Sequence, residues 1–173
     1  RSTGATDVVQ NLEPVKQALG NTALFVDLTV EGMLHAPELP EILKMGTRGL
    51  MISNEHPEAL ERLAPDPALE PKVKAGIKLL RDGKAMTVTS PSGTDLKINL
   101  DGAVAGGGWG YTKRAGTMTH WPGGLCLCFP PSKAVNGTLV MAPGDVNLTF
   151  KRYIESPVKL IIEDDYVTEI VGD

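Results

Sequence analysis

The chain has 173 residues, of which 42% are hydrophobic and 22% are charged, and its formal net charge at pH 7 is −4. These values are ordinary for a soluble globular protein with one domain or two small ones. The sequence has no block of Lys and Arg, which argues against nucleic acid or an anionic membrane as a partner. No apolar stretch reaches the roughly 20 residues that span a bilayer. Cys126 and Cys128 are too close in sequence for a disulfide between them to stabilise the fold, so we expect a reduced, cytoplasmic setting.

The first half of the chain alternates between helical and strand patterns. Asn11, Asn54 and Asp66 can cap helices, and Gly20 can end the first one. The alternation indicates an incomplete, Rossmann-like α/β unit with parallel strands, which we place at residues 1–83. Because two strands do not make a stable sheet, we expect the remaining strands before residue 1 or in a partner. The expected strands lie at residues 23–29 and 49–53, and the expected helices at residues 12–19, 38–45, 54–63 and 68–81.

The pattern changes after Gly83. Two alternating segments flank Pro91-Ser92-Gly93, which predicts a hairpin turn. Residues 101–110 are rich in glycine and are expected to form a loop. Trp109 in this stretch and Tyr111 directly after it fit either a mobile flap or a solvent loop. We interpret residues 84–173 as a β-rich module, so that the fold class is α/β overall. Its strands are expected at residues 85–89, 96–100, 125–129, 137–141, 146–153, 158–162 and 167–171.

The first candidate site follows the strand expected at residues 23–29. Asp27, Thr29 and Glu31 come where this strand should end, and His35 follows just before a helix. Open α/β sheets bind their ligands at the carboxyl ends of their strands, so these side chains are candidates for a binding edge. Histidine titrates near neutrality and is suited to general acid–base catalysis. The alternative for His35 is a capping or surface histidine.

The second candidate site is the turn at residues 119–124, which places His120 beside Trp121. An indole offers a stacking face, so this turn could line a pocket for a flat ring. The alternative is an interface turn with a half-buried tryptophan. The sequence contains no P-loop motif, and Cys126 and Cys128 have no second pair of ligands for a metal, so core packing is the simpler interpretation of both cysteines.

Several segments of the chain carry recognisable motifs: Val26-Asp27, residues 33–38, residues 42–48, Pro57-Glu58-x-Leu60, residues 120–124, residues 136–140 and Gly144-Asp145. The more specific motifs are the Leu-His-x-Pro-Glu stretch around His35 and the His-Trp-Pro turn at His120. Together they resemble the 2,5-dihydroxypyridine 5,6-dioxygenases of nicotinate and nicotine breakdown, and the resemblance runs from about residue 11 to the end of the chain.

The resemblance implies a ring-cleaving, extradiol-type dioxygenase that acts on 2,5-dihydroxypyridine or a related hydroxylated N-heteroaromatic with O₂. Its cofactor would be one non-haem iron(II) (Fe²⁺) held by two His and one Asp, and in the family these ligands lie beyond the region that matches Asp173. No metal ligand is therefore assigned in this chain. The resemblance assigns His35 as the acid/base and His120 and Trp121 to the substrate pocket, with Thr29 and Glu31 at the same edge. A homo-oligomer, or association with the missing segments, is expected.

Two alternatives remain at this point. Residues 92–96 resemble a hairpin of the M29 metallo-aminopeptidases, but those enzymes carry a metal-binding Glu directly after the proline that matches Pro122, and this chain has Gly123 there. A two-metal hydrolytic site needs such carboxylates. The other alternative is a non-catalytic assembly domain. Because the chain starts without methionine and ends directly after a strand-like run, we expect a piece of a longer protein.

Overall fold

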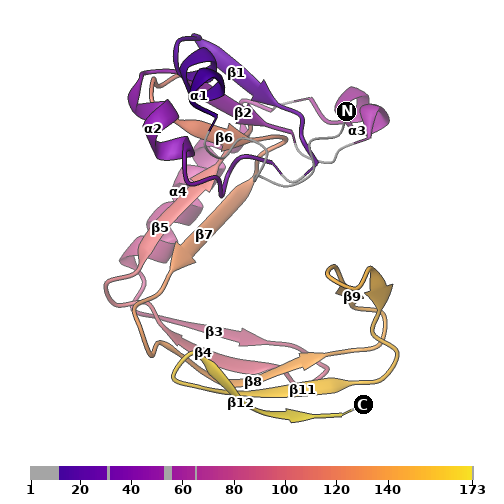
Figure 1. Ribbon diagram of the computed structural model, residues 1–173. Coiled ribbons are helices and arrows are strands. Elements are labelled where there is room, and N and C mark those ends of the chain that lie inside the picture. The colour runs from indigo at the N-terminus through magenta and orange to yellow at the C-terminus, as the bar shows by residue number, and fades with distance from the viewer. Residues whose placement is uncertain (1–11, 31, 53–55, 65, 173) are drawn as a thin grey trace. The chain divides into compact units, whose positions relative to one another are not determined.

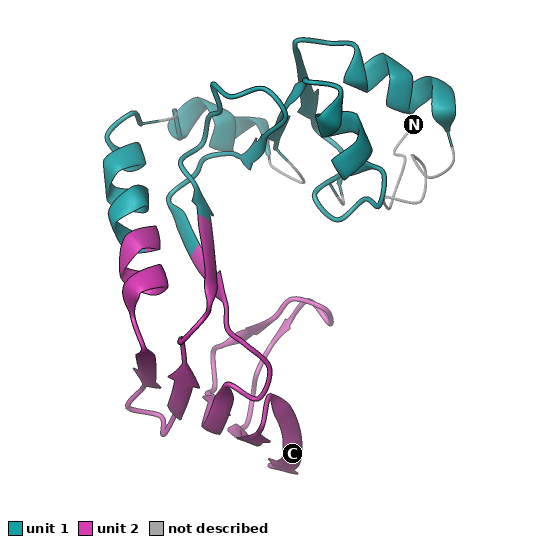
Figure 2. Ribbon diagram, turned by 90° about the vertical axis from the view of Figure 1, so that its left-hand side faces the viewer, with its two compact units in different colours: residues 1–76, 107–126 teal, residues 77–106, 127–173 magenta. Residues whose placement is uncertain are grey.

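The computed structural model describes residues 12–30, 32–52, 56–64 and 66–172. These residues form two compact units (Figure 2), and each is described separately below. The first unit comprises Arg1–Gly76 and Gly107–Cys126, and the second comprises Ile77–Gly106 and Leu127–Asp173. The structure thus combines a parallel sheet and helices with an antiparallel sheet, which confirms the mixed α/β class. None of the helices in these residues has the length and apolar character of a membrane-spanning helix.

The first unit is built on a parallel sheet with strand order β1-β2-β6 (Figure 1). The missing strands were expected before residue 1 or in a partner, but a third strand comes from residues far along this chain. The short segment 118–120 adds this strand to the sheet because it pairs in parallel with β2. The strands are β1 (Leu24–Asp27), β2 (Arg48–Met51) and β6 (Met118–His120).

The helices of the first unit begin at predictable residues. Proline occupies the first turn of three of them, where its missing N–H is not needed. Asp66 caps the fourth, because its carboxylate accepts the N–H of Ala68 at 2.8 Å. The expected caps Asn11 and Asn54 lie outside the described residues, and His56 is the N-cap of the helix after β2. The helices are α1 (Glu13–Gly20), α2 (Leu39–Lys44), α3 (Pro57–Arg62) and α4 (Leu69–Asp82), and α4 continues into the second unit.

The core of the first unit lies where α1 and α2 pack against the sheet. Ile42 of α2 is fully buried and Phe25 of β1 is 6% exposed, and the segment between β1 and α2 adds Met33 and Ala36. Leu19 of α1 and Met118 of β6 pack against this cluster. The segment that follows β1 is therefore anchored in the core, which fixes the backbone near the first candidate site.

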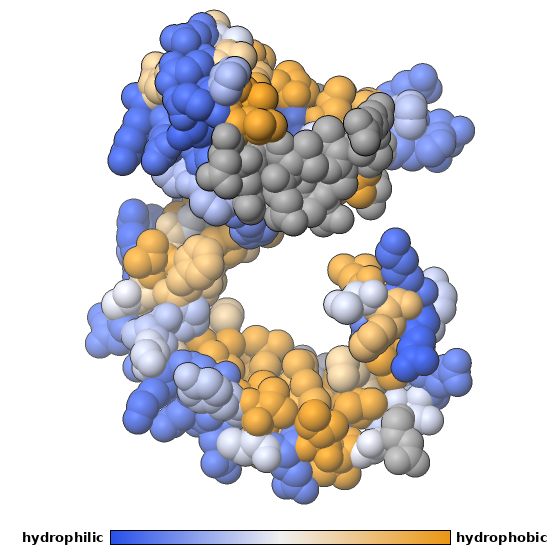
Figure 3. All heavy atoms as spheres, in the orientation of Figure 1, coloured by the Kyte–Doolittle hydropathy of each residue, from blue (hydrophilic) through white to orange (hydrophobic). Residues whose placement is uncertain are grey.

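The second unit contains an antiparallel sheet with strand order β12-β11-β8-β4-β3. The predicted hairpin is confirmed, since Gly93 closes the turn with its N–H bonded to the Ser90 carbonyl at 3.0 Å. Figure 3 shows hydrophobic side chains gathered over this sheet, where Val88, Val167 and Ile170 are exposed. The strands are β3 (Ala85–Thr89), β4 (Asp95–Asn99), β8 (Val135–Met141), β11 (Val158–Glu163) and β12 (Tyr166–Val171).

Two predictions for the later part of the chain were wrong. The single strand expected at residues 146–153 is a small hairpin of β9 (Val146–Asn147) and β10 (Arg152–Tyr153), because the side chain of Asn147 accepts the Phe150 N–H and Lys151 has φ = 52°. The glycine-rich stretch expected as a loop contains β5 (Val104–Gly108), which pairs with β7 (Leu125–Phe129).

The limits of the two units differ from the predicted boundary after residue 83. The segment 107–126 returns to the first unit because it carries β6 into the parallel sheet. In the chain, the division falls within α4, β5 and β7 rather than at one linker.

Gly137 offers a test of the antiparallel sheet. Its φ is 126°, and a Cβ there would stand 2.2 Å from the carbonyl oxygen of Asp95 on the neighbouring strand. We expect Gly137→Ala to lower the free energy of unfolding by roughly 2–3 kcal/mol, because the backbone must shift in addition to adopting a strained φ. Chemical denaturation of the complete protein measures this change.

The matched control for this experiment is Gly144→Ala. Gly144 also has a positive φ, 96°, but a Cβ there would meet nothing within 4 Å. This variant should cost about 1 kcal/mol, from the backbone alone. Equal losses in the two variants would show that the close approach of β4 to Gly137 does not matter.

Candidate functional site at the carboxyl edge of the parallel sheet

The three parallel strands end in register at one edge of the sheet. Asp27 is in register with Met51, and Met51 is in register with His120. The ladder extends one residue further, since the Ile52 N–H bonds to the Asp27 carbonyl at 2.8 Å and the Trp121 N–H to the Met51 carbonyl at 2.9 Å. Asp27 and His120 therefore lie at the same edge, two strand spacings or about 10 Å apart. Sequence alone did not reveal that the two candidate sites share this edge.

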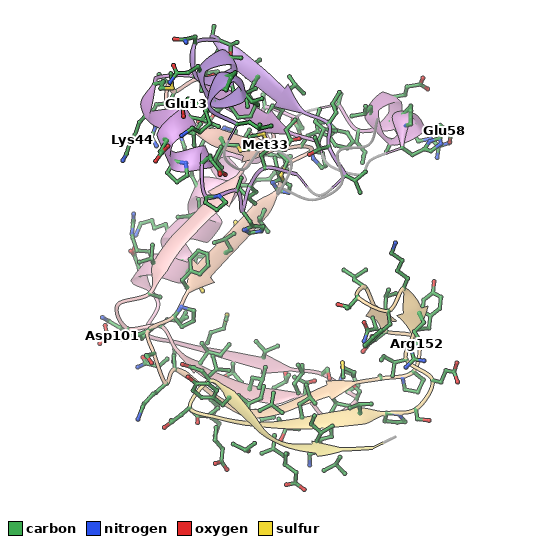
Figure 4. All side chains as sticks on the ribbon, viewed as in Figure 1. Glu13, Met33, Lys44, Glu58, Asp101 and Arg152 are labelled. Atoms are coloured by element: carbon green, nitrogen blue, oxygen red, sulfur yellow. The ribbon has the colours of Figure 1, made fainter. Side chains whose placement is uncertain are left out.

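Asp27 holds the segment that follows β1. Its side chain is buried, and both carboxylate oxygens are used. One oxygen accepts the Thr29 N–H at 3.0 Å and the Thr29 hydroxyl at 2.6 Å, and the other accepts the Met33 N–H at 2.5 Å. The Thr29 hydroxyl also accepts the Gly32 N–H at 3.2 Å. Asp27 and Thr29 thus shape the loop that leads to Met33, which is labelled in Figure 4.

His35 lies on a turn of fixed geometry. The Ala36 N–H bonds to the Met33 carbonyl at 3.0 Å, so that Leu34 and His35 are the central residues of the turn. Met33 and Ala36 are buried in the core, whereas His35 is exposed. Among the described residues, no side-chain hydrogen bond to the imidazole of His35 is present. The turn therefore presents a solvent-accessible imidazole on a backbone that the core anchors.

His120 and Trp121 differ in exposure. His120 is half-buried at the end of β6, and its Nδ1 lies 3.6 Å from the point where a Cβ on Gly108 would stand. Trp121 is only 6% exposed, so little of its ring is accessible within the described chain. The turn after it packs closely on another segment, since a Cβ on Gly110 would lie 2.1 Å from the Pro122 carbonyl oxygen. Glu31 lies outside the described residues.

A pocket of about 670 Å³ lies beside β6 in the first unit. Its wall includes Trp109 and Tyr111, which the sequence had placed in a loop without a defined role. The Tyr111 hydroxyl donates to Glu70 at 2.6 Å, and the Lys74 ammonium donates to the other oxygen of Glu70 at 2.6 Å. Lys74 and Tyr111 lower the pKa of Glu70, and Glu70 raises the pKa of Tyr111. Sequence reasoning missed Glu70 because it comes from α4, far from the loop in sequence.

The described residues do not fit an iron centre of two His and one carboxylate. No group of three or more His, Cys, Asp or Glu side chains in these residues is arranged to hold a metal ion. The Asp27 carboxylate is also fully engaged by the loop that follows it. We therefore derive no chemical step through a metal from this part of the chain.

Comparison with known proteins places the whole chain in one family. All 173 residues match the family model described as NicX, 2,5-dihydroxypyridine 5,6-dioxygenase. The chain is 35% identical over 169 residues to the 2,5-dihydroxypyridine 5,6-dioxygenase of Pseudomonas putida KT2440, covering 98% of this chain and 47% of that protein.

A solved structure gives the same result. The chain resembles the structure of 2,5-dihydroxypyridine dioxygenase from Pseudomonas putida KT2440 with a TM-score of 0.85 and 34% identity. The match covers 95% of this chain and 47% of the other, so this chain spans about half the length of the relatives it matches. We conclude that the chain belongs to the 2,5-dihydroxypyridine 5,6-dioxygenase family.

Proposed function

We propose that the complete protein is a ring-cleaving dioxygenase that acts on 2,5-dihydroxypyridine or a related hydroxylated N-heteroaromatic. The observation that carries this proposal is the family match over all 173 residues, with a TM-score of 0.85 to a solved dioxygenase of that name. Iron(II) would be the cofactor and O₂ the second substrate, in an extradiol-type cleavage. The iron ligands are proposed to lie outside this segment of the chain, and no group of three or more His, Cys, Asp or Glu side chains in the described residues is arranged to hold a metal ion.

His35 is proposed as the general acid/base. It is exposed on an anchored turn at the carboxyl edge of the sheet, where α/β folds bind their ligands. A dihydroxylated pyridine must lose a hydroxyl proton before its ring becomes electron-rich enough for oxidation, and a later step must return a proton. An imidazole that accepts and then donates a proton suits both steps, because histidine titrates near neutrality.

The same edge is proposed to hold the substrate ring. His120 ends β6, two strands away from Asp27 along the same edge of the sheet. Its imidazole can therefore contribute a hydrogen bond from the other end of this edge. Thr29 contributes by shaping the loop that follows Asp27, and Glu31, two residues later in the sequence, is proposed for the same edge. Trp121 is proposed as a rigid support behind His120, in line with its burial.

We further propose a cytoplasmic location, and either a homo-oligomer or association with further segments. Cys126 and Cys128 are both unbridged, as in proteins of reducing compartments. The second unit carries exposed apolar side chains over its sheet, including Ile170 and Val171, and such surfaces favour contact with further chain or a second subunit.

The proposed activity is tested with the complete protein, loaded anaerobically with iron(II). We expect 2,5-dihydroxypyridine to cause oxygen uptake with one O₂ consumed per ring opened, measured with an oxygen electrode and by loss of ring absorbance. The matched control substrate is 2-hydroxypyridine, which lacks the second hydroxyl and should give no uptake. Hydrolysis of a peptide anilide without oxygen uptake would overturn the proposal in favour of an aminopeptidase.

A further inference from the structure

The pocket beside β6 has the size of a small-molecule site. Its volume of about 670 Å³ lies within the roughly 300–1,000 Å³ that such sites occupy. All its lining residues belong to the first unit, so it is a feature of that unit alone. None of His35, His120 and Trp121 is among these lining residues, and the proposed function therefore leaves the pocket without a role.

One side of the pocket is apolar and aromatic. Leu39 and Leu43 of α2 and Met118 of β6 form its apolar wall. The rings of Trp109 and Tyr111 lie 6.4 Å apart at an interplanar angle of 73°. Both rings line the pocket, and a flat ring can pack against them in the offset-stacked or edge-to-face arrangements that aromatic pairs favour.

These two aromatic rings are held in place by neighbouring charges. The Tyr111 hydroxyl is fixed by its hydrogen bond to Glu70, and the Lys74 ammonium lies 5.3 Å from the centre of the Trp109 ring. The Lys113 ammonium lies 5.4 Å from the centre of the Tyr111 ring, and both residues line the pocket. A ligand that enters therefore orders few side chains, which lowers the entropy cost of binding.

A buried hydroxyl in the pocket wall has no hydrogen-bond partner among the described residues. The Oγ1 of Thr119 is buried, and no described residue forms a hydrogen bond with it. Leaving such a group unsatisfied is unfavourable, and a ligand atom that bonds to it removes this cost. Gly108 lies directly beside it, since a Cβ there would stand 3.1 Å from Oγ1. A side chain at residue 108 would crowd the hydroxyl further.

The charges on the pocket wall favour an anion. Lys113 and Arg114 line the pocket, and the described residues form no ion pair with either of them. The acidic side chain in the lining is Glu70, and its two oxygens are already bonded to Lys74 and Tyr111. An anionic group near Lys113 and Arg114 is therefore attracted, without a free carboxylate in the lining to repel it.

We propose that this pocket binds a small planar aromatic acid. The ring lies against Trp109 and Tyr111, the Thr119 hydroxyl bonds to a polar atom of the ligand, and the anionic group faces Lys113 and Arg114. This site goes beyond the proposed ring cleavage and does not depend on it. The same chemistry has two sources: the ionised substrate ring of the proposed reaction, or a separate aromatic carboxylate.

The experiment uses benzoate as the probe and the complete protein, with binding measured by isothermal titration calorimetry. We expect saturable binding with one site per chain, and weaker binding of benzamide, which has the same shape without the charge. Thr119→Val keeps the shape of the side chain and should weaken benzoate binding about fivefold to tenfold, because one hydrogen bond is lost.

Two further variants separate charge from fold. Arg114→Met, at an exposed position, should weaken benzoate binding several-fold and leave benzamide binding unchanged. Lys97→Met removes an exposed lysine in the second unit and should change neither. Failure of benzoate to bind the wild-type protein overturns the proposal, as does equal binding in wild type, Thr119→Val and Arg114→Met.

A competition experiment between benzoate and 2,5-dihydroxypyridine identifies which of the two kinds of ligand the pocket takes. If 2,5-dihydroxypyridine displaces benzoate, the pocket takes the ionised hydroxylated ring. If benzoate binding is unaffected by it, the pocket takes a separate aromatic carboxylate. Both results support the pocket, and neither requires ring cleavage to occur. Loss of oxygen uptake without loss of benzoate binding would overturn the proposed function alone.

Discussion

Replacing Asp27 by asparagine should destabilise the complete protein by roughly 1–3 kcal/mol, although the two side chains have almost the same shape. The carboxylate of Asp27 accepts three hydrogen bonds, from the N–H and hydroxyl of Thr29 and the N–H of Met33. Asparagine has one acceptor oxygen and turns its NH₂ group toward the remaining donors. In either orientation of the amide, one backbone N–H of Thr29 or Met33 loses its partner, and an unsatisfied buried donor costs about 1–3 kcal/mol.

This loss should be local in its origin. Amide hydrogen exchange should accelerate at Met33 and Ala36, because the turn that carries His35 is closed by the bond between them. The matched control is Asp101→Asn, where an exposed carboxylate pairs with Lys84 and the expected change is about 0–1 kcal/mol. If chemical denaturation finds both variants equally stable, with unchanged exchange at Met33, Asp27 does not hold this loop.

The strong local patterns of the sequence predicted most elements of the fold. Asp66, with the periodic apolar side chains after it, predicted α4, and Gly93 between two alternating segments predicted the hairpin of β3 and β4. These signals act over a few residues, so they can be read without knowledge of the tertiary structure. The single strand expected over residues 146–153 failed because the alternation of Val146, Leu148 and Phe150 continues through a turn.

The third parallel strand could not be predicted for a different reason. The three residues of β6 form a strand because each pairs with a residue of β2 that lies 69 positions earlier in the chain, as Met118 does with Gly49. No local pattern reveals a pairing of this kind, since the hydrogen bonds that stabilise it are formed only in the tertiary structure. The same holds for β5, where glycine has a low intrinsic preference for strands and pairing with β7 overrides it.

As with the fold, only the local features of the candidate site could be predicted from the sequence. The position of Asp27 at a strand end identified the edge and, with it, the segment that carries His35. The engagement of Asp27 by Thr29 and Met33 was not visible in the sequence, because it depends on how the loop folds back. The pocket beside β6 was missed since its polar groups, Glu70 and Thr119, come from distant elements.

The second large effect is expected from His35→Ala in the complete, iron-loaded protein. If His35 transfers protons to and from the ring, its removal should lower turnover of 2,5-dihydroxypyridine by about 10²- to 10⁴-fold. Iron content, measured by metal analysis, should be unchanged because His35 is not proposed as a ligand. His35 is exposed in a turn whose backbone is held by Met33 and Ala36, so the variant should fold as the wild type does.

His56→Asn is the control variant, which shows whether the loss of any exposed histidine lowers turnover. His56 is also exposed, and its Nδ1 accepts the Glu58 N–H at the start of α3. Asparagine keeps an acceptor at this cap, so stability and turnover should both stay near wild type.

Proton transfer by His35 requires that His35→Ala alone has reduced turnover with full iron content. It also requires that this variant loses one limb of the pH–rate profile. Wild-type turnover in His35→Ala would remove this residue from the mechanism, and loss of iron with turnover would make it a ligand instead.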